Sequence, residues 1–149
     1  MAAIDIGVKG SFADLFGTYY TQINQNNPAN LSGKITTIDI YIGNDVTGLI
    51  VAIFEKVNGL TFTARCRAVI GDLAAGLHEG IEVDLDVVAG DYIGSKCATG
   101  NPRGNESAGV TMYIQAGDQT ECVEELFTTQ AHAELYLWGD GAEPAPECH

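Results

Sequence analysis

The chain has 149 residues, of which 46% are hydrophobic and 18 are glycine, so it is long enough for one domain with a sizeable core and is unlike a disordered chain. Its 20 acidic and 7 basic residues give a net charge of −13, which argues against direct nucleic-acid binding, because nucleic-acid binders present basic surfaces to phosphates. No apolar run approaches membrane-spanning length and the first residues lack a signal-peptide pattern, so we expect neither membrane insertion nor classical secretion.

The first part of the chain predicts an arm, two strands and the loop between them. Residues 1–16 mix glycine and apolar residues without firm periodicity and form the predicted N-terminal arm. Residues 17–24 are rich in Tyr and Thr, which favour strands. Residues 25–33 contain an Asn-Pro turn starter and predict a loop. A second strand over 35–42 is expected to end at the Gly-Asn-Asp sequence 43–45.

The middle of the chain predicts a hairpin. Residues 48–56 are apolar at nearly every position, which indicates a central strand covered on both faces. The Asn-Gly pair at 58–59 is a strong hairpin signal, and a strand over 60–70 follows it. Residues 71–80 predict a connection with a helical turn over 73–77. The strand over 60–70 is expected to point Leu60, Phe62, Ala64, Cys66, Ala68 and Ile70 inward and Thr61, Thr63, Arg65 and Arg67 outward.

Residues 81–94, read IEVDLDVVAGDYIG, carry the clearest pattern in the chain. Apolar residues alternate with Glu82, Asp84 and Asp86, and a Gly-Asp turn at 90–91 follows. This predicts a half-buried antiparallel strand that enters a hairpin or a sandwich corner. The three acids are spaced as in a carboxylate active site or a calcium site, but the solvated face of a sheet explains them more simply.

The last third of the chain predicts an exposed loop, two strands and a tail. Residues 99–109 are polar and turn-rich, and they are the best candidate for an exposed functional loop. A strand over 110–114 leads into an Ala-Gly-Asp turn at 116–118. The final strand is expected over 130–138, followed by a Pro- and Gly-rich tail over 139–149.

These elements predict an all-β fold: an antiparallel, jelly-roll-like β-sandwich of about eight strands. The sandwich domain is expected over residues 17–138, between the arm at 1–16 and the tail at 139–149.

Catalytic signatures are missing from the sequence. Nucleophilic catalysis needs a nucleophile beside a base, usually histidine, and the three histidines, His78, His132 and His149, stand in no recognisable motif. There is no Gly-x-Ser-x-Gly elbow and no calcium-binding loop of the EF-hand type. We therefore predict a protein that is not an enzyme and has no cofactor or metal.

Four cysteines, Cys66, Cys97, Cys122 and Cys148, are candidates for disulfides. Their spacing fits neither a zinc site nor a CxxC redox pair, and the sequence does not choose among the three complete pairings. Cys66 alternates with apolar residues and is expected to be a buried free thiol. Cys122 or Cys148 is the candidate for a disulfide to a neighbouring subunit in oxidising surroundings.

Two groups of side chains are candidates for contacts with a partner. Arg65 and Arg67 are expected to pair with the acidic strand face of their own sheet, or else with an acidic patch on a neighbouring subunit. His132, Tyr136 and Trp138 share one face of the last predicted strand. Such a row suits a subunit interface or a sugar-stacking platform, and we favour the interface.

Four short stretches carry a resemblance to a known family: IDIG at 4–7, NPAN at 27–30, IDIY at 38–41 and VVAGDYIG at 87–94. Together they resemble a β-sandwich module of tailed-phage and prophage structural genes and of environmental sequences, over about residues 4–138. The resemblance implies a jelly-roll-like sandwich used in virion decoration proteins, fibres and tail components, or in other extracellular assemblies. It implies no catalytic residues, and Cys97 and the tail with Cys148 depart from the usual ending of the module.

The predicted function is accordingly structural. We expect a self-assembling subunit of a phage virion or an extracellular filament, located in that assembly. Its partners would be copies of itself or other structural proteins of the same particle. The alternative is a carbohydrate-binding or receptor-binding module, in which Tyr136 and Trp138 stack on a sugar and the 99–109 loop supplies polar contacts.

Overall fold

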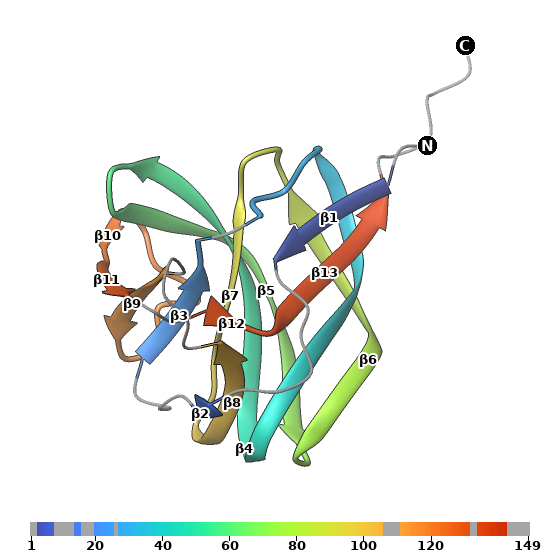
Figure 1. The fold of residues 1–149 in the computed structure, drawn as a ribbon. Coiled ribbons are helices and arrows are strands. Elements are labelled where there is room, and N and C mark those ends of the chain that lie inside the picture. Colours follow the sequence, from blue (N-terminus) through green and yellow to red (C-terminus); the bar gives the residue numbers. More distant parts are fainter. Residues whose placement is uncertain are drawn as a thin grey trace.

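The structure is a computed structural model, and it describes residues 3–7, 14–15, 20–25, 27–105, 111–131 and 134–142. Every regular element in these ranges is a strand and every strand pair is antiparallel (Figure 1), which confirms the predicted all-β class. No helix among them is long and apolar enough to cross a membrane. The thirteen strands are β1 (Ala3–Gly7), β2 (Asp14–Leu15), β3 (Tyr20–Asn24), β4 (Gly33–Asn58), β5 (Thr61–Leu73), β6 (Gly76–Val87), β7 (Tyr92–Lys96), β8 (Thr99–Asn105), β9 (Thr111–Ala116), β10 (Glu125–Leu126), β11 (Thr128–Ala131), β12 (Glu134–Leu135) and β13 (Leu137–Ala142).

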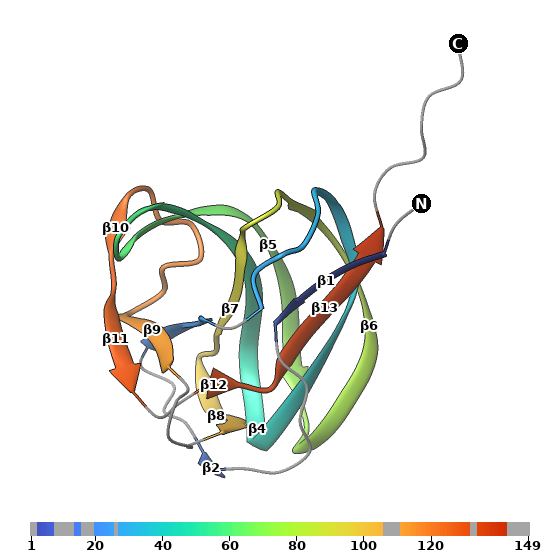
Figure 2. The same ribbon diagram turned by 45° about the horizontal axis from the view of Figure 1, so that its top comes forward.

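The long strand β4 organises the fold because its two halves pair with different neighbours. Its first half lies between β13 and β6, and its second half lies between β5 and β7. This gives one group of strands in the order β1-β13-β4-β6 and a second in the order β10-β5-β4-β7-β3-β9-β11, continuous through β4 (Figures 1 and 2). The expected break at 43–45 was wrong, since β4 passes through it and absorbs the irregularity as register shifts against β8.

Two hydrophobic cores lie on opposite faces of β4. Val51 and Ile53 belong to a first core made mostly of isoleucine, leucine and valine, whereas Ala52 and Phe54 belong to a second, aromatic core. All four side chains are buried, which confirms the prediction of a central strand covered on both faces. In the aromatic core, ring centroids lie 4.8 to 6.2 Å apart, in tilted or edge-to-face contacts of the kind aromatic pairs prefer.

A β-bulge at Arg65 lets β5 contribute to both cores. Ile53 pairs with Cys66 and the next residue, Phe54, pairs with Ala64, so Arg65 is the extra residue on β5. Ala64 therefore packs on the aromatic core while Cys66 packs on the first core, although an undisturbed strand would point both to one face. All six residues predicted to point inward do pack on a core. Leu60, Phe62 and Ala64 pack on the aromatic core, and Cys66, Ala68 and Ile70 pack on the first core.

The hairpin predicted at the Asn-Gly pair is confirmed, since β4 and β5 pair across it, with Asn58 opposite Thr61. The Gly-Asp turn at 90–91 forms a corner: β6, before it, pairs with the first half of β4, and β7, after it, pairs with the second half. The Val88–Asp91 corner therefore links the two groups of strands.

Three predicted segments differ from the structure. The connection over 71–80 and its helical turn were wrong, because only Ala74 and Ala75 separate β5 from β6. Residues 99–105 of the predicted loop form β8, and the rest of that loop, 106–110, lies outside the described residues. The single strand expected over 130–138 is replaced by β11, β12 and the start of β13, with residues 132–133 outside the description.

Both predicted ends contain strands. β1 lies within the predicted arm and pairs with β13 from Ala3 opposite Ala142 to Gly7 opposite Trp138. β13 extends into the predicted tail because its glycines allow close packing. A Cβ on Gly141 would lie 1.8 Å from the Lys34 carbonyl oxygen, far inside any real contact. These glycines allow neighbouring strands to approach closely. Composition alone does not distinguish this role of glycine from its role in a flexible tail.

Candidate functional site

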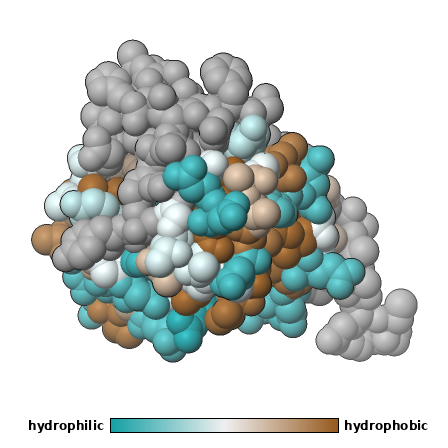
Figure 3. Space-filling model, turned by 90° about the horizontal axis from the view of Figure 1, so that it is seen from below, coloured by the Kyte–Doolittle hydropathy of each residue, from teal (hydrophilic) through white to brown (hydrophobic). Residues whose placement is uncertain are grey.

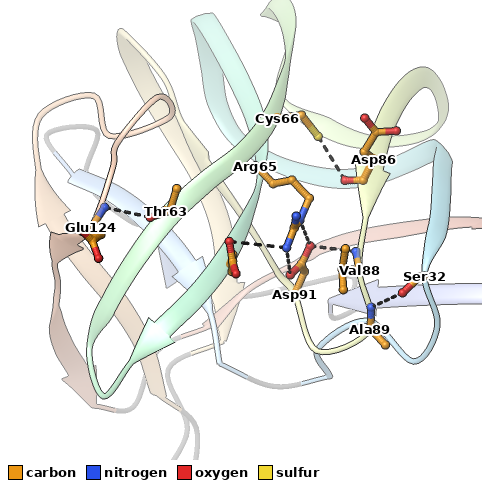
Figure 4. Close-up of polar contacts among 10 residues, drawn as sticks. Ser32, Thr63, Arg65, Cys66, Asp86, Val88, Ala89, Asp91 and Glu124 are labelled. Atoms are coloured by element: carbon orange, nitrogen blue, oxygen red, sulfur yellow. Dashed lines mark hydrogen bonds and ion pairs between the residues drawn. The ribbon is translucent and has the colours of Figure 1, made fainter.

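The Val88–Asp91 corner is held by a charge pair between buried Asp91 and half-buried Arg65 (Figure 4). Asp91 is only 3% exposed, and its carboxylate accepts from Arg65 Nε at 2.5 Å, from the Arg65 guanidinium NH2 group at 3.1 Å and from the Val88 N–H at 2.9 Å. The hydrogen bonds that Arg65 donates to Asp91 raise the pKa of the Arg65 guanidinium, against the opposing effect of its burial. A two-pronged, charge-assisted pair of this kind fixes orientation as well as contributing energy, so the bulge residue of β5 fastens the corner after β6.

The loop over 27–32 joins this corner. The Ala29 N–H donates to the Asp91 carbonyl and the Gly90 N–H donates back to the Ala29 carbonyl, both at 2.8 Å. The Ala89 N–H donates to Ser32 Oγ at 2.9 Å (Figure 4). Because the loop and the corner exchange main-chain hydrogen bonds, each one limits the motion of the other.

The same loop covers the outer edge of β1. The Asp5 N–H donates to Asn30 Oδ1 at 2.9 Å, and Asn30 Nδ2 donates to the Ala3 carbonyl at 3.1 Å. The Gly7 N–H donates to the Asn27 carbonyl at 2.9 Å, and Asn27 Nδ2 donates to the Gly7 carbonyl at 3.0 Å. Four backbone groups of β1 that face away from β13, the N–H groups of Asp5 and Gly7 and the carbonyls of Ala3 and Gly7, are thus satisfied, which leaves little template for pairing with another chain. We call this arrangement the capped edge.

The opposite outer strand of this group, β6, has an acidic face. The side chains of Glu82, Asp84 and Asp86 are exposed, as expected for the solvated face of a sheet. Lys34 lies 3.0 Å from Asp84 and 2.8 Å from Asp86. Its hydrogen bonds with Asp86 and Asp84 raise the pKa of the Lys34 ammonium. The acids therefore form an exposed charged row and not a closed carboxylate site.

Both predicted arginines find partners within the chain. Arg65 pairs with Asp91 and lies 3.7 Å from Glu55. Arg67 lies 3.0 Å from Glu121 and donates to Thr120 Oγ1 at 3.2 Å. Pairing within the chain was the favoured prediction. The partners, however, are a corner, a neighbouring strand and a loop, and not the acidic face of β6, because the bulge turns Arg65 toward the corner.

The three cysteines in the described part of the chain are free thiols. Cys66 Sγ donates to the Asp86 carbonyl at 3.2 Å, Cys97 is buried, and Cys122, 9% exposed, donates to the Phe62 carbonyl at 3.5 Å. Burial raises the pKa of all three thiols, which lowers their thiolate fraction and their reactivity. Cys148, the fourth candidate for a disulfide, lies outside the described residues.

Of the predicted row His132, Tyr136 and Trp138, the structure describes only Tyr136 and Trp138. His132 lies outside the described residues. Tyr136 and Trp138 are half-buried, and the Tyr136 carbonyl accepts the Tyr41 N–H at 3.1 Å. Trp138 is paired with Gly7 of β1 on one side and Asp39 of β4 on the other, and its Nε1 atom is shielded from solvent. The Trp138 indole is therefore less exposed than the ring of a sugar-stacking platform would be.

Exposed apolar side chains gather at one end of the molecule, beside the β4–β5 hairpin. Val57 on the hairpin is 39% exposed, and Val123 and Leu126 on the adjacent segment are 76% and 63% exposed. The two segments lie side by side because β10 pairs with the start of β5 and the Glu124 N–H donates to Thr63 Oγ1 at 2.9 Å (Figures 2 and 4). We call Val57, Val123 and Leu126 the hairpin-end patch. The sequence pattern does not predict this patch, because it depends on the pairing of β10 with β5.

A shallow hollow of about 300 Å³ lies between β4 and the end of β5 and is lined by Asp45 and Asp72 among others. Both carboxylates are engaged with backbone: Asp45 Oδ1 accepts the Ala75 N–H at 2.9 Å, and Asp72 Oδ1 accepts the Gly48 N–H at 3.1 Å. Within the described ranges, no group of three or more His, Cys, Asp or Glu side chains is placed to hold a metal ion.

No family model, curated protein or solved structure matches this chain. The surfaces described above are therefore the basis for a function.

Proposed function

We propose that this protein is a structural, self-assembling subunit with a jelly-roll-like sandwich fold. Its place would be a phage virion, as a decoration, fibre or tail component, or an extracellular filament. Its partners would be copies of itself or other structural proteins of the same particle. The hairpin-end patch is the observation that carries this proposal.

The patch has the composition of a small contact surface. Exposed acids stand close to its apolar residues in the sequence: Glu55 is two residues before Val57, and Glu124 directly follows Val123. An apolar centre with a polar rim is typical of protein interfaces. Fully burying one Val or Leu side chain contributes about 1.5–3 kcal/mol, so the patch supplies a weak contact in one pair of subunits. Many copies of a weak contact suffice in a repetitive assembly.

A structural role also suits the way in which polar side chains are used. The Arg65–Asp91 pair, the two asparagines of the capped edge and Ser32 all hold loops and corners against strands. Such contacts favour a rigid frame that presents the same surface in every copy.

For a covalent lock between subunits we propose Cys148. Cys122, the other candidate, has its thiol in the aromatic core, so a bond from it to another subunit would require that core to open. A bond through Cys148 would stabilise the assembly without using any of the three thiols in the described part of the chain.

The test is the oligomeric state of the purified protein by sedimentation velocity and electron microscopy over a range of concentrations. We expect oligomers or filaments that dissociate in the Val123→Asp/Leu126→Asp variant. Val69→Asp is the matched control, because Val69 is similarly exposed, at 68%, but lies on β5 away from the hairpin end. A monomer at every concentration, or equal dissociation in both variants, would contradict the proposal.

The covalent lock has a separate test. Oxidised assemblies should give multimers on non-reducing gels that collapse to one band with reductant and are missing in Cys148→Ser. Multimers that persist in Cys148→Ser but vanish in Cys122→Ser would assign the bond to Cys122 instead.

A further inference from the structure

β6 is an outer strand whose far side has no backbone partner among the described residues. It pairs with β4 along its length. Apart from the Gly80 N–H, which donates to Asp39 Oδ1 of β4, and the Asp86 carbonyl, which accepts from Cys66 Sγ, no backbone group of residues 80–87 has a hydrogen bond to a described residue outside that pairing. The remaining outer N–H and C=O groups of this stretch can therefore pair with another extended chain. In this respect β6 differs from β1, whose outer side is occupied by the loop over 27–32.

The inward side chains of β6 are incompletely covered along this open side. Leu85 and Val87 are buried, but Ile81 and Val83 are only half-buried where they pack on the first core. Across from them, Ala68 and Ile70 of β5 are also half-buried. The first core is thus thinly covered between β5 and β6, and an added strand would remove this apolar surface from water.

The open side is bounded at both of its ends. At one end, Cys66 Sγ donates to the Asp86 carbonyl. At the other, β5 turns into β6 through the exposed residues Ala74 and Ala75, with Leu77 exposed beside them. Figure 3 views the molecule from this end and shows hydrophobic and hydrophilic side chains interspersed on its surface. The available stretch of β6 is therefore about the length of a short strand.

The negative charge of β6 favours a cationic strand as the partner of its open side. The exposed face of this stretch carries Glu82, Asp84 and Asp86, and Lys34 is the cation beside them. If β6 of a second copy paired antiparallel about Val83, Glu82 would face Asp84 of that copy, and like charges placed directly opposite destabilise a sheet. A strand with Lys or Arg at alternate positions would instead place cations opposite the acids.

We propose that residues 80–86 of β6 bind an extended, cationic segment of another protein by strand addition. Lys or Arg side chains of that segment would face Glu82 and Asp84, and the apolar residues between them would cover Ile81 and Val83. This interaction uses a different surface from the hairpin-end patch and does not depend on self-assembly.

The test uses a blocked synthetic peptide of nine alternating valine and lysine residues, with binding measured by isothermal titration calorimetry. Backbone amide hydrogen exchange locates the bound peptide. We expect binding that slows exchange of amides in residues 80–86 and weakens with added salt. A peptide of the same composition with all its lysines in one block should bind at least fivefold more weakly, because it cannot alternate cations with apolar residues.

Glu82→Lys should weaken binding of the alternating peptide at least fivefold. Glu124→Lys is the matched control: it makes the same charge change on an exposed acid at the hairpin end and should leave the affinity within twofold. Val123→Asp/Leu126→Asp should also leave it unchanged, so failure of the assembly proposal and failure of this one are distinguishable.

Three results would overturn the proposal. The first is the absence of binding. The second is equal loss of affinity in Glu82→Lys and Glu124→Lys, or equal affinity for the two peptides, which would mean unspecific attraction to an acidic protein. The third is protection of residues 80–86 that rises with protein concentration without peptide, which would assign the edge to a second copy.

Discussion

β1 and β6, the two outer strands of the group β1-β13-β4-β6, differ in how their outer sides are covered. β1 buries Ile4 and Ile6 completely, and Asn27 and Asn30 satisfy four of its outer backbone groups. β6 leaves Ile81 half-buried and carries a row of exposed acids instead of a cover. Both devices are known means of keeping sheet edges from unspecific pairing. The difference is that a capped edge leaves few backbone groups for any partner, whereas an acidic edge disfavours acidic strands and favours basic ones.

The largest expected difference between the edges comes from deleting one isoleucine side chain at each. Ile6→Ala removes a fully buried side chain and should lower the free energy of unfolding by about 3–4 kcal/mol. Ile81→Ala removes a half-buried one and should cost about 1 kcal/mol, because water already reaches part of it. Urea unfolding of both variants measures the contrast. Equal losses would mean that the edges are equally covered.

The next effect is loss of the corner that holds the cap. Asp91→Ala leaves the guanidinium of Arg65 partly buried without its main partner and should lower the free energy of unfolding by about 2–3 kcal/mol. Because the loop over 27–32 is bonded to this corner, amides of β1 should also exchange faster, while those of β6 that face β4 change less.

The control for this variant is Asp84→Ala, which removes an exposed partner of Lys34 and should cost under about 1 kcal/mol. If Asp91→Ala were no more destabilising than Asp84→Ala, the pair at the corner would not be holding the loop.

A smaller effect is expected from the cap itself. Asn30→Ala removes an acceptor for the Asp5 N–H and a donor to the Ala3 carbonyl. Because these groups are exposed, water replaces them in part, and the expected loss is about 1 kcal/mol. The informative measurement is hydrogen exchange of the Asp5 amide, which should quicken more than any amide of β6. An unchanged Asp5 amide would show that the cap does not protect the edge.

The smallest effect concerns the loop that covers part of β5, where the Cys122 carbonyl accepts the Ala64 N–H. Burial raises the pKa of Asp118 in this loop, but hydrogen bonds from Thr120 and the positive charge of Arg67 outweigh it and hold that pKa below its ordinary value of 3.8. Its contribution to stability is therefore present above pH 3.8 and is lost as the pH falls from there through the lower, folded-state value.

Asp118→Asn should flatten this part of the stability curve, and Asp84→Asn serves as an exposed control. The measurement is thermal unfolding of the three proteins between pH 5 and pH 2.5, a range of about one unit or more on each side of the ordinary value. A wild-type curve that Asp118→Asn leaves unchanged would contradict this assignment.

Local patterns predicted much of the fold. The alternation in β5 and β6, the apolar run over 48–56 and the Asn-Gly hairpin were sufficient because each signal is contained in a few consecutive residues. The continuation of β4 through 43–45 and of β13 through Gly139 and Gly141 was not foreseen. Glycine marks a turn in one context and close packing between strands in another, and only the neighbouring strand decides between them.

The candidate surfaces were harder to foresee because they depend on distant contacts. Asn27 and Asn30 stand in a stretch typical of a turn, but their partners in β1 lie 20 and 25 residues away. Arg65 was expected on an outward face, and a bulge that depends on pairing with β4 turned it to Asp91. The hairpin-end patch needs β10 beside β5, a pairing with no local signature.

The contrast between a capped and an open edge is tested most directly by residue-resolved hydrogen exchange of the wild-type protein. The Asp5 and Gly7 amides of β1, which donate away from β13 to Asn30 and Asn27, should be protected. In residues 80–86 of β6, amides that face β4 should be protected, and those on the outer side should exchange at nearly the rate of an exposed amide. Uniform protection along this stretch of β6, at any protein concentration, would contradict the open edge.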